Sequence, residues 1–113
     1  RRAQAPVETG QARFFTHDDL KIDFARAEVW RAGNAISLSA TEYRLLLQFA
    51  HNIGKILTSE DLLTSVWCVE YKTDKEILWV SIARLRQKLE EDAHNPRHII
   101  TRSGLGYLMI PEV

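Results

Sequence analysis

The apolar residues of this chain change their spacing once, near residue 39, and this change sets the order of its secondary structure. Before it, large apolar side chains recur at every second position, as at Leu20 and Ile22. After it, they recur at intervals of three and four, as at Leu45 and Phe49. A period of two is typical of half-buried strands, and a period of 3.6 is typical of amphipathic helices. The chain is therefore predicted to be α+β, with a sheet that precedes its helices.

Turn signals divide the first of these regions into four short strands. "HDD" at 17–19 is one such signal, and "AGN" at 32–34 is another, in which Gly33 and Asn34 can adopt positive φ. Near the other end of the chain, the strand residues at 99–101 and 107–110 flank a turn at 103–104, which predicts a β-hairpin. The two ends of the chain are thus predicted to be β structure, as a four-stranded antiparallel sheet and a C-terminal hairpin.

Three helix starts lie between the sheet and the hairpin. A Ser or Thr that is followed three residues later by an acidic residue predicts a capping box, in which each side chain bonds the other's backbone amide. The three pairs are Ser39 with Glu42, Thr58 with Asp61, and Thr73 with Glu76. The third pair opens the longest predicted helix, at about 74–91. The order of sheet, three helices and hairpin is typical of a winged helix-turn-helix, in which the third helix reads DNA.

Composition limits the partners that such a fold can have. The chain has 113 residues, enough for one domain, and its 15 basic and 15 acidic residues balance, so any nucleic-acid binding must come from local clusters. One cysteine, Cys68, excludes an internal disulfide framework and suits a reducing compartment. With no apolar run of membrane-spanning length and no signal peptide, the chain is expected to be soluble and cytoplasmic. It opens with Arg1 and no initiator methionine, which suggests a fragment of a longer protein, and polar residues 1–12 read as a linker before a domain at 13–113.

The third predicted helix has two different faces. Its core stripe consists of Leu78, Ile82, Leu85 and Leu89. The other side consists of Glu76, Val80, Ala83, Arg84 and Gln87. It is mostly small or apolar, with arginines towards the second half of the helix, whereas a plain surface helix would spread Glu and Lys there. Apolar groups can meet thymine methyls in a DNA major groove, and Arg84 can reach guanine edges or phosphates. The alternative is a helix covered on both sides by the protein's own strands and loops. Trp79 lies on the shoulder between the two faces, and its place is left open.

Several separated motifs together resemble one family. They are "LSATEYRLLLQFAHNIGKILTSEDLLTSVW", "VSIARLRQKLEED" and "NPRHIITRSGLGYL". In order and spacing these are similar to the DNA-binding effector domain of OmpR/PhoB-type response regulators, over about residues 13–110. The resemblance implies a winged helix and an N-terminal receiver domain, phosphorylated on aspartate by a sensor kinase, that this chain lacks. It also implies that RNA polymerase is a partner, that two copies bind direct repeats of double-stranded DNA, and that the isolated domain is a monomer.

Site residues follow from this resemblance position by position. The implied DNA contacts are Trp67, Ile77, Val80, Ser81, Arg84, Arg86, Thr101, Arg102, Ser103, Gly104 and Tyr107. The implied polymerase-contacting loop is Cys68, Val69, Glu70, Tyr71, Lys72 and Thr73. For Arg86, an intramolecular salt bridge and a phosphate contact are equal alternatives. The indole N–H of Trp67 can reach a phosphate while its ring caps the core.

Departures from the family pattern bear on the strength of binding. Glu76 and Ala83 occupy positions that are basic in many members, and the wing arginine stands one position early, at Arg102, with Ser103 in its place. Because adjacent strand residues point to opposite faces, the direction of Arg102 stays open. Glu76 is interpreted as part of the cap that starts its helix. Fewer basic contacts predict weaker binding by the isolated domain and a shallower salt dependence, since the slope scales with the phosphates neutralised.

Other kinds of chemistry find little support in the sequence. The four histidines have no i, i+4 pair and no carboxylate at ligand spacing, so no metal site is predicted. The sequence 104–106 precedes a strand, which is the wrong context for a phosphate-binding loop. Catalysis and a cofactor are therefore not expected. Two alternatives to a response regulator stay open: a winged-helix protein-interaction module that docks a partner through Trp79, and the same DNA-binding domain in a membrane-tethered regulator.

Overall fold

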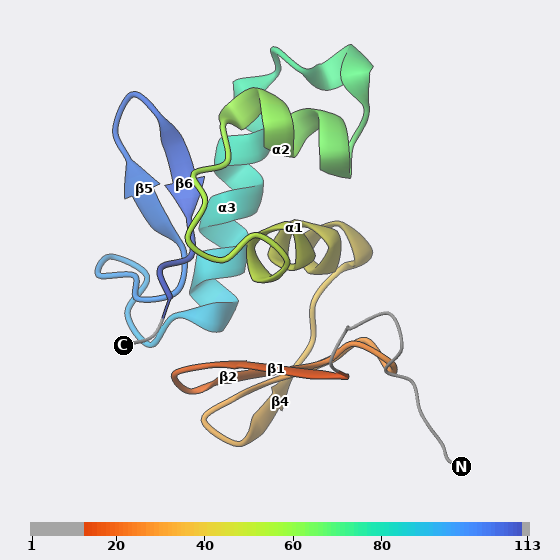
Figure 1. Cartoon of the computed structure of the whole chain (residues 1–113), viewed down its shortest axis with the longest axis vertical. Helices are drawn as coiled ribbons and strands as arrows, with labels where there is room; N and C mark the ends of the chain where they lie inside the picture. Colours follow the sequence, from red (N-terminus) through yellow and green to blue (C-terminus); the bar gives the residue numbers. More distant parts are fainter. Residues whose placement is uncertain (1–12, 112–113) are drawn as a thin grey trace. The chain divides into compact units, whose positions relative to one another are not determined.

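The computed structural model describes residues 13–111, except for the side chain of Val69, and these residues form two compact units that divide between Ile36 and Ser37 (Figure 1). The first unit holds an antiparallel sheet, and the second holds three α-helices and a hairpin. The predicted fold class is thereby confirmed. The proposed linker at 1–12 and the last two residues of the domain lie outside the described residues. No helix between residues 13 and 111 has both the length and the apolar character needed to cross a membrane.

The sheet contains four short strands in sequence order. They are β1 (Phe14–His17), β2 (Leu20–Asp23), β3 (Glu28–Arg31) and β4 (Asn34–Ile36). Arg31 pairs with Asn34, so the turn between β3 and β4 consists of Ala32 and Gly33, with φ of 52° and 84°. The prediction of positive φ at Asn34 was wrong because the register already uses Asn34 in β4, which moves the two-residue turn back by one position.

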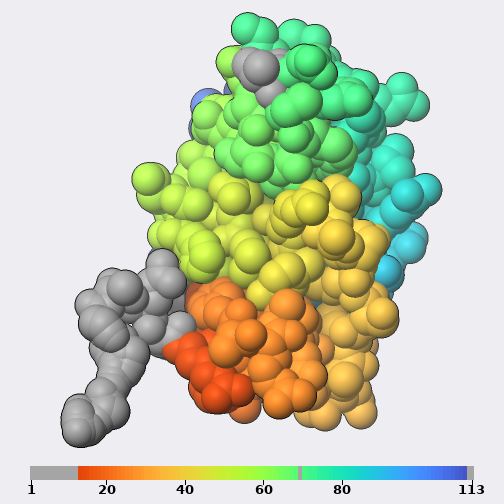
Figure 2. Space-filling view, turned by 90° about the vertical axis from the view of Figure 1, so that its right-hand side faces the viewer, coloured from red at the N-terminus to blue at the C-terminus, as the bar shows by residue number. Residues whose placement is uncertain are grey.

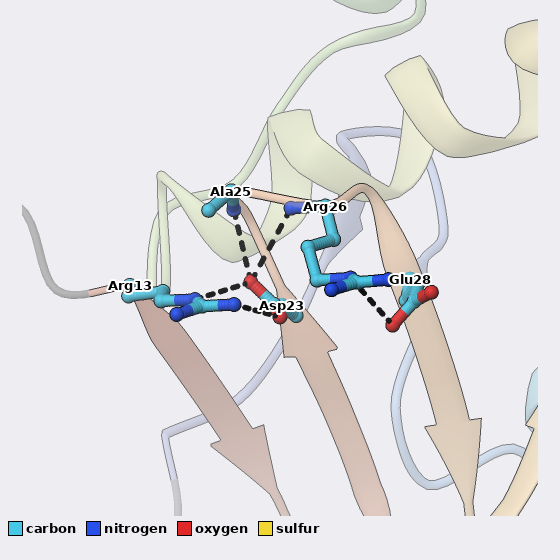
Figure 3. Close-up of polar contacts among 5 residues, drawn as sticks. All are labelled: Arg13, Asp23, Ala25, Arg26 and Glu28. Atoms are coloured by element: carbon cyan, nitrogen blue, oxygen red, sulfur yellow. Dashed lines mark hydrogen bonds and ion pairs between the residues drawn. The ribbon is translucent and has the colours of Figure 1, made fainter.

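The carboxylate of Asp23, at the end of β2, bonds both the residue before β1 and the turn that follows β2. Asp23 accepts hydrogen bonds from Nε and Nη2 of Arg13, each at 3.0 Å, and from the backbone amides of Ala25 and Arg26 (Figure 3). Hydrogen bonding by Arg13 lowers the pKa of Asp23, although desolvation acts in the opposite direction. A neighbouring ion pair joins Arg26 to Glu28 at 3.5 Å. The Arg13 contact therefore favours the folded chain as long as Asp23 is ionised.

This cluster predicts a specific acid sensitivity. Because the folded-state pKa of Asp23 is lowered, its stabilisation is present above the ordinary aspartate pKa of about 4 and is lost as pH falls through the lowered folded value. Asp23→Asn should reduce the free energy of unfolding in urea at pH 7 and flatten its decline below about pH 4. Glu28→Gln, at a partly exposed ion pair, should change neither. Parallel pH curves for wild type and Asp23→Asn would contradict this assignment.

Two of the three predicted capping boxes are confirmed in the second unit. Its elements are α1 (Ala40–Ala50), α2 (Ser59–Val66), the 3-10 turn η2 (Val69–Tyr71), α3 (Lys75–Leu89), β5 (Ile100–Arg102) and β6 (Gly106–Leu108). Ser39 and Glu42 cap α1 reciprocally at 3.1 and 2.9 Å. Thr58 and Asp61 do the same for α2 at 3.0 and 3.2 Å. Each pair satisfies two backbone amides that the first turn of a helix leaves free.

The third helix starts differently from the prediction. Asp74, not Thr73, is the N-cap of α3, and its carboxylate accepts a hydrogen bond from the amide of Ile77 at 3.4 Å. The preceding turn fixes this start, because the amide of Asp74 bonds to the carbonyl of Tyr71. Glu76 is therefore the second residue of α3, and its interpretation as part of a capping box with Thr73 was wrong. Its charge still lies in the first turn, where a helix favours a carboxylate.

The core of the second unit is built by one stripe from each helix. Its largest buried side chains are Leu45, Leu46, Phe49, Leu62, Leu63, Leu78, Ile82, Leu85, Leu89 and Ile99. The predicted core stripe of α3 is thus confirmed, and each of its leucines contributes about 1.5–3 kcal/mol by burial. Lys88 ties α3 to α1 by an ion pair with Glu42 at 2.7 Å. In the space-filling view, α2 and the residues that follow it, in green, form one end of this unit (Figure 2).

Candidate nucleic-acid interface

The exposed side of α3 carries one continuous strip of predicted site residues. Ile77, Val80, Ser81 and Arg84 follow the i, i+3, i+4, i+7 spacing of one helix face, and they line a single shallow depression. Val80 is 41% exposed and Arg84 is exposed, whereas Ile77 and Ser81 are half-buried. The structure therefore brings these four residues together, and we call them the α3 strip.

The chemistry of the α3 strip suits the floor of a DNA major groove. Within residues 13–111, the Arg84 guanidinium makes no hydrogen bond or ion pair, so its donors can turn towards a ligand. An arginine fork matches the two acceptors of guanine, and the methyl groups of Ile77 and Val80 match the methyl of thymine. Glu76 lies beside the start of the strip and repels phosphate. The attractive end of the strip is therefore the end at Arg84.

Arg86 serves a different purpose from Arg84. Its Nε and Nη2 donate to the carbonyl of Ile99 at 3.1 and 2.9 Å, and Nη2 also donates to Oγ1 of Thr101 at 2.8 Å. These partners are neutral oxygens and replace the salt bridge considered from the sequence. Burial lowers the pKa of Arg86, and the neighbouring Tyr107 and Glu90 counteract this effect. Arg86 thus uses two of its nitrogens to hold β5 against α3.

The residue that caps the C-terminus of α3 holds the segment that leads into β5. Glu90 is the C-cap of the helix and is 4% exposed. Its carboxylate accepts hydrogen bonds from the backbone amides of Arg97, His98 and Ile99 at 2.7–3.1 Å. Three amides that would otherwise need water or other partners are satisfied by one charged group. Glu90 and Arg86 together hold the hairpin, which lies beside α3 in Figure 1.

The hairpin β5–β6 presents most of the predicted wing residues to solvent. Thr101, Arg102, Ser103 and Gly104 are exposed, but Tyr107 is only 8% exposed, and burial raises the pKa of its hydroxyl. Tyr107 also pairs with Leu57 through two backbone hydrogen bonds of 2.8 and 3.0 Å. A Cβ on Gly106 would lie 2.2 Å from the carbonyl oxygen of Leu57, so only glycine permits this approach. Tyr107 and Gly106 therefore anchor the base of the wing, and its tip is the part open to a ligand.

A groove of about 860 Å³ separates the wing from the start of α3. Its lining includes Thr58, Lys72, Lys75, Trp79, Arg102 and Leu105. We call it the α3–wing groove. Trp79, which the sequence could not place, is 58% exposed and belongs to this groove. Arg102 lines it as well, so the early arginine of the wing is directed to the same space as Trp79.

The predicted polymerase-contacting loop is a surface turn between α2 and α3. Its backbone forms η2, in which the amide of Tyr71 bonds to the carbonyl of Cys68 at 2.9 Å. Glu70, Tyr71, Lys72 and Thr73 are exposed, and Cys68 is half-buried. Lys72 and Thr73 also line the α3–wing groove, so this loop has two neighbouring surfaces.

Trp67, the last of the predicted site residues, is the C-cap of α2 and is half-buried. This partial exposure leaves room both for packing by its ring and for an outward contact.

Comparison with known proteins places this geometry in a family. The family model described as "Transcriptional regulatory protein, C terminal" matches residues 33–109. The chain belongs to this family. The transcriptional regulatory protein KdpE of Mycobacterium tuberculosis is 38% identical over 107 residues, which are 95% of this chain and 47% of that relative. KdpE of Escherichia coli is 38% identical over 89 residues, or 79% of this chain and 40% of the relative.

Solved structures agree with the family and identify the branch. The response regulator DrrB of Thermotoga maritima, an OmpR/PhoB homologue, has a TM-score of 0.82 at 34% identity, with 92% of this chain and 47% of that chain covered. The RstA DNA-binding domain of Klebsiella pneumoniae, solved in complex with the RstA box, has a TM-score of 0.80 at 30% identity, with 89% and 100% covered. The chain has the fold of an OmpR/PhoB-type effector domain, and it spans about half the length of the curated relatives it matches.

Some residues of the interface carry no clear signal in the sequence. Lys75 and Leu105 are not among the predicted site residues, yet both line the α3–wing groove. Glu90 is not among the predicted site residues either. Its role depends on amides seven to nine residues further along the chain, which no helical pattern could reveal.

Proposed function

We propose that this domain binds double-stranded DNA with sequence preference by placing the α3 strip in the major groove and the tip of the wing on the adjacent minor groove or backbone. The observation that carries the proposal is the exposed guanidinium of Arg84, which is unpaired within residues 13–111 and lies on a helix face whose opposite stripe is buried. Family membership supports it, as does the structural similarity to a domain solved in complex with its DNA box.

The geometry supports a division of labour within this interface. Base reading falls to α3, because the α3 strip combines apolar groups with an arginine on one helix face. Positioning falls to the wing, which presents Thr101, Arg102 and Ser103 around its glycine tip. The packing by Arg86 and Glu90 sets the spacing between the two parts. Contacts to phosphate fix register, and contacts to base edges supply sequence preference.

A protein-interaction module that uses Trp79 is the second candidate. Trp79 is 58% exposed, as docking would require. Its surroundings favour an anionic ligand, however, because Lys72, Lys75 and Arg102 line the same groove. DNA binding is therefore favoured over the docking of a partner protein.

Further partners are proposed from the family relation. They are a sensor kinase that acts through a receiver domain, RNA polymerase at the exposed loop 68–73, and a second copy of the domain on a direct repeat. The exposure of Glu70, Tyr71 and Lys72 supports the loop as a contact surface. The loop assignment predicts that changing Tyr71 alters transcription without altering affinity for DNA. Membrane tethering of the parent protein is an alternative that the full-length sequence decides.

Selection from a random duplex library tests the proposal. The domain should enrich one motif, and it should bind that duplex at least about tenfold more tightly than a scrambled duplex at about 150 mM salt. The affinity should fall with salt along a log-log slope of about 0.9 for each phosphate neutralised, with only a few phosphates involved. Equal affinity for the selected and scrambled duplexes would overturn the claim of sequence preference.

A further inference from the structure

The exposed indole of Trp79 is the largest apolar surface on α3 that neither the core nor the α3 strip uses. It is 58% exposed, and the residues beside it on the core stripe, Leu78 and Ile82, are buried. A single exposed apolar side chain needs no special explanation, so it is the surroundings of Trp79 that indicate a ligand. Trp79 opens into the α3–wing groove and not onto the α3 strip.

The groove around Trp79 has the chemistry of a site for a sugar–phosphate strand. Three of its side chains are cationic, Lys72, Lys75 and Arg102, against one carboxylate, Glu60. Thr58 and Thr101 also line it, and although each hydroxyl oxygen accepts a hydrogen bond within the protein, each O–H is still a donor. Cations and hydroxyls are the usual partners of phosphate oxygens, and a flat aromatic ring suits the apolar face of a deoxyribose. The indole N–H adds one donor that can reach a phosphate.

The position of the groove selects the segment of DNA. It lies between α3 and the wing, so in the proposed complex, with α3 in the major groove and the wing on the minor groove, it would face the backbone between the two. We propose that the α3–wing groove seats this sugar–phosphate strand and that Trp79 is its central contact. This inference rests on the proposed function and adds to it a binding site whose main residue, an aromatic side chain, carries no charge.

A backbone contact by Trp79 predicts a distinct pattern of changes in DNA affinity when the residue is substituted. A contact with the backbone adds affinity for every duplex and carries no sequence information. Trp79→Ala should therefore weaken binding to the selected and the scrambled duplex alike, by about tenfold. In Trp79→Ala, the log-log slope of affinity against salt concentration should stay unchanged, because no cation is removed. Lys75→Ala should lower the magnitude of that slope by about 0.9. Ile56→Ala removes a 41% exposed apolar side chain outside the groove and should change neither quantity.

Fluorine NMR on the whole chain labelled with 5-fluorotryptophan provides a direct readout. The chain has three tryptophans, and the resonance that disappears in Trp79→Phe belongs to Trp79. In the free protein, this resonance should shift between H2O and D2O because the ring is exposed. Addition of the selected duplex should abolish that shift. Addition of poly-glutamate at equal charge should leave it in place.

The possible outcomes distinguish a failure of the groove assignment from a failure of the proposed DNA-binding function. If Trp79 stays open to solvent in the DNA complex and Trp79→Ala binds like wild type, the groove assignment is overturned and the role of α3 stands. A loss confined to the selected duplex would make Trp79 a base contact and would overturn the backbone assignment. Shielding by poly-glutamate would show a general anion site and would overturn the duplex assignment. If the wild-type chain does not bind DNA, the proposed function itself fails.

Discussion

Replacing Arg84 by alanine is expected to remove most of the preference of this domain for its DNA site. The side chain is exposed and unpaired within the described residues, so its loss costs the fold little. A bidentate arginine contact to guanine contributes about 1–3 kcal/mol of discrimination, which is about 5- to 150-fold in affinity. Fluorescence anisotropy with the selected and scrambled duplexes measures this directly. The affinity for the selected duplex should fall towards that for the scrambled one.

Two further variants sharpen this test. Arg84→Lys keeps the charge but loses the planar fork, so it should recover binding to the scrambled duplex and little of the preference. Arg44→Ala removes another exposed arginine, on α1, and should leave both affinities near wild type. If Arg84 instead contacts a phosphate, Arg84→Lys should restore wild-type affinity for both duplexes. An unchanged ratio of the two affinities in Arg84→Ala would show that the α3 strip does not read bases.

The largest effect on stability is expected from Glu90→Ala. This change leaves the amides of Arg97, His98 and Ile99 without their acceptor, and the last two of these residues are buried. Hydrogen bonds to a charged group contribute about 1.5–3 kcal/mol each, and solvation of some amides recovers part of that. We expect the free energy of unfolding in urea to fall by about 3 kcal/mol or more. The loss would be a large part of the stability of a domain of this size.

The neighbouring glutamate supplies the matched control. Glu91 forms a 3.8 Å ion pair with Arg97 between side chains that are 75% and 58% exposed. Glu91→Ala should change the free energy of unfolding by about 0.5 kcal/mol at most, because exposed pairs contribute little. Equal losses in the two variants would mean that charge at the end of α3, and not the bonds to the amides, stabilises the loop before β5.

The elements of this fold were predictable because each one carries a local signal. The change in apolar spacing near residue 39 marks the border between sheet and helices, and two capping boxes mark the starts of α1 and α2. The third start was placed one residue early because Thr73 and Asp74 are both good N-caps. The choice between them depends on the turn η2, whose hydrogen bond to the amide of Asp74 involves a residue outside the helix.

The candidate site was predictable only where one helix carries it. Helical spacing alone groups Ile77, Val80, Ser81 and Arg84, and the structure confirms that they share one face. The position of Trp79 depends on the wing, which is distant in sequence, so a helical wheel leaves that residue on a shoulder. The same limit applies to Arg86, whose closest partners are Ile99 and Thr101. Tertiary contacts, and not local patterns, separate the residues that hold the interface from those that face the ligand.

Methylation interference on the selected duplex tests the placement of α3 most directly. Methylation of guanine at N7 blocks the major groove, and methylation of adenine at N3 blocks the minor groove. Binding should be lost when guanines within the motif are methylated at N7, and the N7 effect at one of them should disappear in Arg84→Ala. Interference at adenine N3 alone, or at no base of the motif, would contradict the claim that α3 reads DNA from the major groove.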